Sequence, residues 1–254
     1  MNYFAPKSAA ERYAKGRPYF HPHVVSRIKA YLSLVKPVAR ALDVGCGTGL
    51  STRSLKAIAR HVVGIDPSVE MMALAPPDLQ IEYIVAPAEK IPANDHDFDL
   101  ITLSSVFHWI SRSLFFVEAA RVLRPHGWLV VYDNYFSARM EENSAFQAWG
   151  REHYVTKYPS PPRARVGFGA EDSEKEGFQF VGQEDYQNFM KFSIETLVEY
   201  LITQSNIIAA VEGGKERIED VRQWLTESVT PFFAGRAEAT FMFRGPIWYL
   251  RPSV

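Results

Sequence analysis

Apolar runs alternate with helical patterns through the first half of the chain. The runs are short and end in glycine or polar residues, and stretches with apolar residues at helical spacing follow several of them. This alternation is typical of a parallel sheet that helices cover on both faces. It predicts strands at Ala41–Val44, His61–Ile65, Ile81–Val85, Phe98–Leu103 and Gly127–Tyr132.

Capping residues and proline mark the expected helices. Pro22 occupies a first-turn position ahead of an apolar helical stripe that extends to Leu32. Ser68 is a suitable N-cap after the second strand, and Ser111 is one after the fourth. The helix that begins at Ser111 is expected to end before Pro125, because the residue that precedes a proline disfavours helical geometry.

The alternation ends after Asp133. A helical stretch leads into a proline-rich and then a glycine-rich, charged segment that runs to Gly177. Insertions of this length are more often functional lids than connectors. Further strand and helix patterns follow. The sequence therefore predicts an α/β protein: a Rossmann-like, doubly wound sheet of seven strands with a lid inserted after the fifth strand.

Length, composition and charge exclude several classes of protein function. The chain has 254 residues, which suits one α/β domain with additions. Hydrophobic residues make up 47% and charged residues 22%, a balance that excludes extensive disorder. The 28 Lys and Arg residues against 29 Asp and Glu residues give a net charge of -1, so there is no general positive field for phosphate backbones or anionic lipid. We expect neither nucleic acid nor a membrane as a partner.

Hydropathy and cysteine content indicate the compartment. The longest stretches without Asp, Glu, Lys or Arg have 12 residues each, at 100–111 and 200–211, whereas a membrane-spanning helix needs about 18. Charged residues interrupt the N-terminal segment, so we expect no signal peptide. Cys46 is the single cysteine and cannot form an internal disulfide or a cysteine-rich zinc site. We expect a cytoplasmic protein without a metal, and no pattern predicts its oligomeric state.

A glycine-rich loop lies where the first strand turns into the first helix of the sheet. Its glycines allow backbone groups to approach a ligand closely. A dinucleotide fingerprint needs glycine or alanine at the sixth position counted from Gly45, but Leu50 stands there. Asp43 precedes the turn and suits an ammonium or sulfonium group better than a pyrophosphate. The loop therefore disfavours an NAD-type oxidoreductase without excluding it.

A second carboxylate ends the second strand. Asp66 follows Asp43 by 23 positions, where a carboxylate can accept hydrogen bonds from both hydroxyls of a ribose. The alternative is a turn or cap residue, because Pro67 and Ser68 follow. The two acids at this spacing favour a nucleoside ligand.

Four motifs together resemble one enzyme family. The segments Ala41–Gly49, Val63–Ser68, Phe98–Thr102 and Arg121–Gly127 are similar, in order and spacing, to the successive motifs of class I S-adenosylmethionine-dependent methyltransferases. The resemblance is strong over residues 40–133. Three further segments resemble the small-molecule branch that includes trans-aconitate methyltransferase, namely Tyr13–Pro18, Ser105–Trp109 and Ile194–Ser205.

The resemblance implies a set of residues that contact S-adenosylmethionine. It puts Gly45 and Gly47 against the methionine part of the cofactor and Asp66 on its ribose. Tyr13 and Arg17 fall in an N-terminal flap, where Arg17 suits the cofactor carboxylate, the alternative being a solvated surface side chain. The full set is Tyr13, Arg17, Asp43, Gly45, Cys46, Gly47, Asp66, Pro67, Met71, Ala88, Glu89, Ser104 and His108.

The adenine end of the site departs from the family pattern. Ala88 and Glu89 match the loop that contacts the adenine edge, but Pro87 stands where many relatives have Asp. Either Glu89 or a backbone carbonyl must then accept from the adenine amino group. Met71 is placed against the adenine face, with core packing as the alternative. Ser104 matches a position lining the cofactor cleft, and His108 at the same mouth is a candidate for moving a proton.

Methyl transfer from a sulfonium is an in-line displacement that needs no dedicated nucleophile. A general base is required only if the acceptor atom carries a proton, so no catalytic residue is assigned. Residues for acceptor choice are expected in the lid and the C-terminal half. Arg163 and Arg165 either clamp an anionic acceptor or balance nearby surface acids. The aromatic candidates, each also a candidate for lid core, are Tyr135, Phe136, Trp149, Tyr154, Tyr158, Phe168, Trp224 and Trp248.

The sequence thus predicts a methyltransferase that acts on a small-molecule acceptor. The alternatives are an S-adenosylmethionine-binding protein without turnover and an NAD-type oxidoreductase. Within one domain spanning 1–254, we expect an N-terminal flap and helix at 1–35, a cofactor-binding core at 36–135, an inserted lid at 136–182, and C-terminal strands and helices at 183–254 that complete the sheet.

Overall fold

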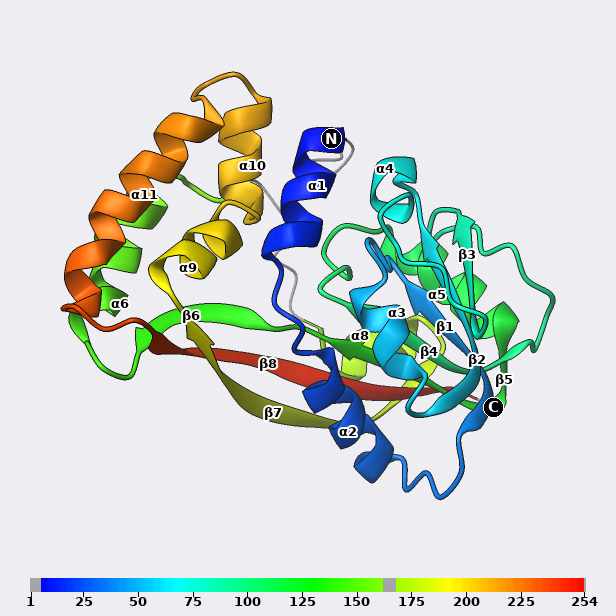
Figure 1. The fold of residues 1–254 in the computed structure, drawn as a ribbon. Coiled ribbons are helices and arrows are strands. Elements are labelled where there is room, and N and C mark those ends of the chain that lie inside the picture. Colours follow the sequence, from blue (N-terminus) through cyan, green and yellow to red (C-terminus); the bar gives the residue numbers. More distant parts are fainter. Residues whose placement is uncertain (1–5, 162–167, 254) are drawn as a thin grey trace. The chain divides into compact units, whose positions relative to one another are not determined.

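The computed structural model describes residues 6–161 and 168–253 and contains two compact units (Figure 1). We call one the sheet unit, because it holds the parallel strands, and the other the helical unit. Within the described residues, the sheet unit comprises 19–134, 168–186 and 245–253, and the helical unit comprises 6–18, 135–161 and 187–244.

The sheet unit is built on five parallel strands. β1 (Val38–Val44) lies between β2 (Ala59–Asp66) and β4 (Phe98–Ser104), with β3 (Ile81–Val85) beyond β2 and β5 (Leu123–Tyr132) beyond β4. All five predicted strands are confirmed. The order β3-β2-β1-β4-β5 brings the loops after β1, β2 and β4 to one edge, because parallel strands end at the same side of a sheet.

Helices cover the two faces of this sheet. The sheet-unit helices are α2 (His21–Tyr31), α3 (Leu50–Leu55), α4 (Val69–Met72), α5 (Arg112–Val122) and α8 (Ala170–Lys175). Neighbouring residues of a strand belong to opposite cores: Leu42 packs with Ile101 in one cluster, whereas Ala41 packs with Leu100 in another. Both faces are therefore buried, as expected for a doubly wound sheet.

The helical unit has an aromatic core of its own. Its elements are α1 (Lys7–Gly16), β6 (Tyr135–Met140), α6 (Ala145–Trp149), the π-helix η1 (Gly150–Tyr154), α7 (Val155–Lys157), α9 (Ile194–Leu201), α10 (Ser205–Glu212) and α11 (Ile218–Phe233). Phe146 and Phe241 are fully buried, with ring centroids 5.0 Å apart. The members of this core all lie in the helical unit, so the unit has a buried apolar cluster of its own.

Two long strands contribute residues to both units. β7 (Phe178–Phe192) pairs with β8 (Ala239–Pro252). β8 runs antiparallel to β5 through 247–250 and antiparallel to β6 through 241–244. The hydrogen-bonded sheet of the described residues therefore has eight strands, not the predicted seven, because β6 forms inside the segment expected to be lid.

The predicted segment boundaries differ from those of the two units. The N-terminal segment 1–35 divides, since α1 belongs to the helical unit and α2 to the sheet unit. The expected lid 136–182 also divides: its first part forms β6 and the helices that follow, whereas Phe168 packs on Phe107 and Phe116 of the sheet unit at ring distances of 4.9 and 5.7 Å. Apolar burial in two separate cores explains the division. Arg163 and Arg165 lie outside the described residues.

Candidate functional site

The loop after β1 requires glycine at its turns. Gly45, Gly47 and Gly49 have φ angles of +69°, +53° and +77°, a region that side-chain-bearing residues rarely adopt. A Cβ atom on Gly45 would lie 2.3 Å from a methyl group of Val106. The loop is also tied to β2, since the N–H groups of Gly45 and Cys46 donate to the carbonyl of Ile65 at 2.8 and 3.0 Å. Its backbone is thus fixed without a ligand.

Asp43 is fully buried under this loop. Its carboxylate accepts hydrogen bonds from the hydroxyls of Ser51 at 2.6 Å, Thr52 at 2.7 Å and Thr102 at 3.1 Å. Burial outweighs these bonds and raises the pKa of Asp43 to about 6. The carboxylate therefore joins β1, α3 and β4 at the start of the loop, and its action on a cofactor charge stays a prediction.

Asp66 lies at the end of β2 beside the same loop. One carboxylate oxygen accepts the N–H of Gly47 at 3.0 Å, and the other accepts the N–H of Ser68 at 2.8 Å. Burial raises the pKa of Asp66 from its ordinary value. Asp66 therefore holds both the glycine loop and the turn into α4, and its contact with the ribose hydroxyls stays a prediction. A carboxylate has about four acceptor positions, so each oxygen retains one for a further donor.

The first residues of α4, the helix that follows β2, pack against the glycine loop that follows β1. Ser68 caps this helix, as predicted, by accepting the N–H of Met71 at 3.3 Å. Met71 is buried, and its terminal methyl lies 3.0 Å from where a Cβ of Gly47 would be. The sulfur of Cys46 lies 3.3 Å from that of Met72. Burial raises the pKa of the Cys46 thiol well above its usual range, which keeps it neutral. Pro67 is exposed.

The segment after β3 holds the residues expected at adenine. Ala88 is buried, and Pro87 is exposed. One carboxylate oxygen of Glu89 accepts the N–H of Ser111 at 2.7 Å, directly before α5. Glu89 is thus anchored to the helix that follows β4, while its second oxygen has no hydrogen bond among the described residues.

The chain turns sharply after β4. Ser104 is half-buried, and Ser105 has a φ of +56° with its N–H donating to the carbonyl of Tyr132 at 2.9 Å. His108 is half-buried, with its ring 4.9 Å from that of the more exposed Trp109. These residues follow β4 at the same edge as the glycine loop, since Val106 contacts Gly45.

Tyr13 and Arg17 lie in the helical unit. The Arg17 guanidinium donates to the carbonyl of Thr203 at 3.0 Å and lies 4.7 Å from the ring centre of Tyr13 and 5.6 Å from that of Tyr200. Arg17 is therefore packed between aromatic rings, which differs from the solvated surface alternative. Its contact with the cofactor carboxylate stays a prediction.

Most aromatic candidates for acceptor choice are core residues. Tyr135 is half exposed. Phe168 and Trp248 pack on each other in the sheet unit, with ring centroids 5.4 Å apart. The others belong to the aromatic core of the helical unit: Phe136, Trp149, Tyr154, Tyr158 and Trp224. The core alternative therefore holds for these aromatic residues.

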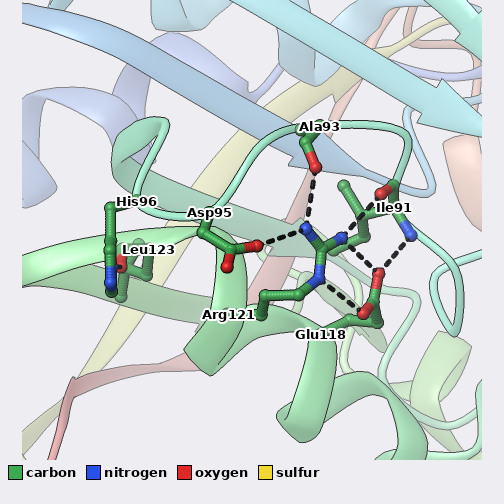
Figure 2. Close-up of polar contacts among 7 residues, drawn as sticks. All are labelled: Ile91, Ala93, Asp95, His96, Glu118, Arg121 and Leu123. Atoms are coloured by element: carbon green, nitrogen blue, oxygen red, sulfur yellow. Dashed lines mark hydrogen bonds and ion pairs between the residues drawn. The ribbon is translucent and has the colours of Figure 1, made fainter.

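Several functional neighbours were not found from the sequence. The hydroxyls of Ser51, Thr52 and Thr102 donate hydrogen bonds to Asp43. The sequence feature that points to them is a hydroxyl residue inside a predicted apolar strand or on the buried face of a helix. Arg121 and Glu118 form a polar cluster on α5 (Figure 2). Arg121 was noted only as part of a motif.

The sheet unit also contains a cavity that the predicted site residues do not line. It has a volume of about 400 Å³ and is lined near the beginnings of β1 and β4 by Arg40, Asp97 and Phe98, among others. Within 6–161 and 168–253, no group of His, Cys, Asp and Glu side chains is arranged to hold a metal, and no helix is long and apolar enough to span a membrane.

Comparisons with known proteins find a methyltransferase domain in the chain. Residues 42–131 match the model of a methyltransferase domain. A protein of Dictyostelium discoideum that is assigned to the methyltransferases is 25% identical over 226 residues, covering 87% of this chain and 84% of that protein. An uncharacterized methyltransferase of Mycobacterium tuberculosis is 32% identical over 162 residues, covering 63% of this chain and 62% of that protein, which is less than two thirds of its length.

Solved structures share the fold. A protein of Anaeromyxobacter dehalogenans assigned to the type II methyltransferases superposes with a TM-score of 0.67 at 20% identity, covering 88% of this chain and 94% of that one. A phosphoethanolamine N-methyltransferase of Haemonchus contortus, in complex with S-adenosyl-L-methionine, has a TM-score of 0.54 at 16% identity and covers 99% of this chain and 58% of that one. The narrower likeness to trans-aconitate methyltransferase stays a prediction. In its matched domain, its glycine loop and its strand order, the chain is similar to the class I S-adenosylmethionine-dependent methyltransferases.

Proposed function

We propose that this protein transfers the methyl group of S-adenosylmethionine to a small-molecule acceptor. The observation that carries the proposal is the Asp66 carboxylate at the end of β2, which is anchored by two backbone N–H groups and keeps one acceptor position on each oxygen. The two neighbouring hydroxyls of a ribose can each donate a hydrogen bond to one of these oxygens. The buried Met71 beside Gly47 supplies an apolar surface of the kind that an adenine ring needs.

The residues of the sheet unit have separate tasks in this proposal. When bound, the cofactor supplies a methyl group that is already activated by its sulfonium. Asp66 holds the ribose by accepting hydrogen bonds from its hydroxyls, and the loop at Gly45 and Gly47 lets backbone groups lie against the methionine part. The second carboxylate oxygen of Glu89 accepts a hydrogen bond from the adenine amino group. In many relatives an Asp has this role. Orientation of the acceptor then gives an in-line displacement.

A small acceptor is supported by charge and by similarity. The net charge of -1 provides no general attraction for nucleic acid. The Haemonchus enzyme, which shares the fold, is named for a small phosphorylated amine. A carboxylate acceptor would need no base, because its attacking oxygen carries no proton.

The test has two stages. Calorimetry should show binding of S-adenosylmethionine or S-adenosylhomocysteine without comparable heat from NAD or NADP, and tighter nicotinamide binding would overturn the proposal. Incubation with cofactor labelled in the methyl group and a panel of small acids, amines and phenols should then give labelled product. Cofactor binding with no labelled product from any class would favour the alternative of a binding protein without turnover.

A further inference from the structure

All five N–H groups of the Arg121 guanidinium have acceptors. Nε and one terminal nitrogen donate to the two oxygens of Glu118, one turn earlier on α5, at 2.9 and 2.8 Å. The same terminal nitrogen donates to the carbonyl of Ile91 at 2.9 Å. The other donates to the carbonyl of Ala93 at 2.8 Å and to Asp95 at 3.0 Å. The planar fork of arginine is the only side chain with five such donors.

Glu118 completes the attachment of this segment to α5. Its second oxygen also accepts the N–H of Ile91 at 2.7 Å, so both backbone polar groups of Ile91 are bound (Figure 2). The hydrogen bond from Arg121 holds the pKa of Glu118 below its ordinary value, which keeps the carboxylate ionised. Figure 2 shows both side chains rising from α5 toward the loop that passes over them.

The segment has no regular structure to position it. Residues 86–97 contain no helix or strand, so side chains complete the hydrogen bonding of a backbone that has only scattered backbone partners, such as the carbonyl of Asp66 for the N–H of Ala86. Ile91 is buried in the core, and its neighbours Ala88 and Glu89 lie two to three residues earlier. Glu89 accepts the N–H of Ser111 at the beginning of α5. The segment is thus held at two points along α5, by the N–H of the N-cap residue Ser111 and by Glu118 and Arg121 toward the end of the helix.

We propose that Arg121 is a positioning residue for adenine recognition, acting through Ile91 and Ala93 on Ala88 and Glu89. The inference rests on the proposed function, in which Ala88 and Glu89 face the adenine edge. Arg121 has no task at the cofactor itself. A lysine at this position keeps the charge beside Glu118 and Asp95 but cannot reach both carbonyls and the carboxylate at once.

The experiment measures how well the protein distinguishes adenine from hypoxanthine. Binding of S-adenosylhomocysteine is compared by calorimetry with binding of S-inosylhomocysteine, in which a carbonyl oxygen replaces the adenine amino group. The wild-type protein is expected to prefer the adenine compound at least tenfold. Arg121→Lys should lose most of this preference, and Arg121→Gln should behave in the same way. Arg27→Met, which removes an arginine paired with Glu184 on another part of the sheet unit, should keep it.

The ratio of affinities separates positioning from stability. A purely structural role would lower the melting temperature of the Arg121 variants without changing the ratio, and that result would overturn the inference. If Arg121→Gln does not fold, Arg121→Lys and Glu118→Gln carry the comparison. A wild-type protein that binds both compounds equally would also overturn it. Failure of the wild-type protein to bind S-adenosylhomocysteine would instead overturn the proposed function.

Discussion

The backbone N–H of Gly47 donates to the carboxylate of Asp66 at 3.0 Å, so the loop after β1 is anchored to the carboxyl end of β2. The two elements meet because β1 and β2 are parallel neighbours, with Asp43 opposite Gly64 in the register. One carboxylate therefore shapes the glycine loop and is available to a ligand at the same edge. A change at Asp66 should affect both.

Asp66→Ala should lower the affinity for S-adenosylhomocysteine at least tenfold. Charge-assisted hydrogen bonds contribute about 1.5–3 kcal/mol each, and a tenfold change corresponds to about 1.4 kcal/mol. Asp78→Ala is the matched control, because Asp78 likewise accepts the N–H of the residue two positions on, at 2.9 Å, but stands outside the site. Calorimetry measures the affinity of both variants for S-adenosylhomocysteine. Equal affinity in the two would reduce Asp66 to a turn residue.

Gly45→Ala should destabilise the protein more than Gly177→Ala. Both glycines have positive φ, +69° and +80°, which costs a residue with a Cβ about 1–2 kcal/mol. Only at Gly45 does the new Cβ meet a neighbour, Val106 at 2.3 Å, and such overpacking adds about 1–3 kcal/mol. Urea denaturation measures the difference. Indistinguishable midpoints would mean that Val106 moves aside freely.

The free energy of unfolding should carry a pH dependence from Asp43. Burial raises its pKa from 3.8 to about 6, so between these values the folded protein binds this proton more tightly than the unfolded chain. Its contribution is therefore largest below about pH 4 and falls by about 3 kcal/mol as the pH rises through 6.

Asp43→Asn removes this titration while keeping the size of the side chain. Urea unfolding at pH 4, 5, 6 and 7 should give a difference, wild type minus variant, that declines with pH, because other groups cancel. A flat difference would show that Asp43 stays ionised throughout and is stabilised by the hydroxyls of Ser51, Thr52 and Thr102.

Gly16→Ala should loosen α1 from α9 within the helical unit. A Cβ on Gly16 would lie 2.2 Å from the carbonyl oxygen of Glu199, so the helices must separate. Trypsin cleavage after Arg12 or Lys15 should become several-fold faster than in the wild-type protein. Gly169→Ala is the control, since nothing lies within 4 Å of its added Cβ. Unchanged cleavage in Gly16→Ala would show that α1 does not depend on this contact.

Periodicity along the chain determined the parallel part of the sheet. The five predicted strands were correct because a strand buried on both faces is a local apolar run, and its ends are marked by local turn residues. Ser68 was identified as a cap for the same reason, since an N-cap interacts only within its own first turn. The glycine loop and its departure from a dinucleotide fingerprint were likewise visible in a few adjacent residues.

Tertiary structure alone decided which side chains meet. Thr102 reaches Asp43 because β4 lies beside β1 in a register that puts the two residues opposite each other, 59 positions apart in sequence. Arg121 finds Ile91 and Ala93 because the chain between β3 and β4 passes over α5. Phe168, in the segment expected to be a lid, packs on Phe107, because an aromatic side chain is buried wherever apolar partners surround it. Hydrophobic character determines that a residue is buried. The long-range arrangement of strands and helices determines which residues it packs against.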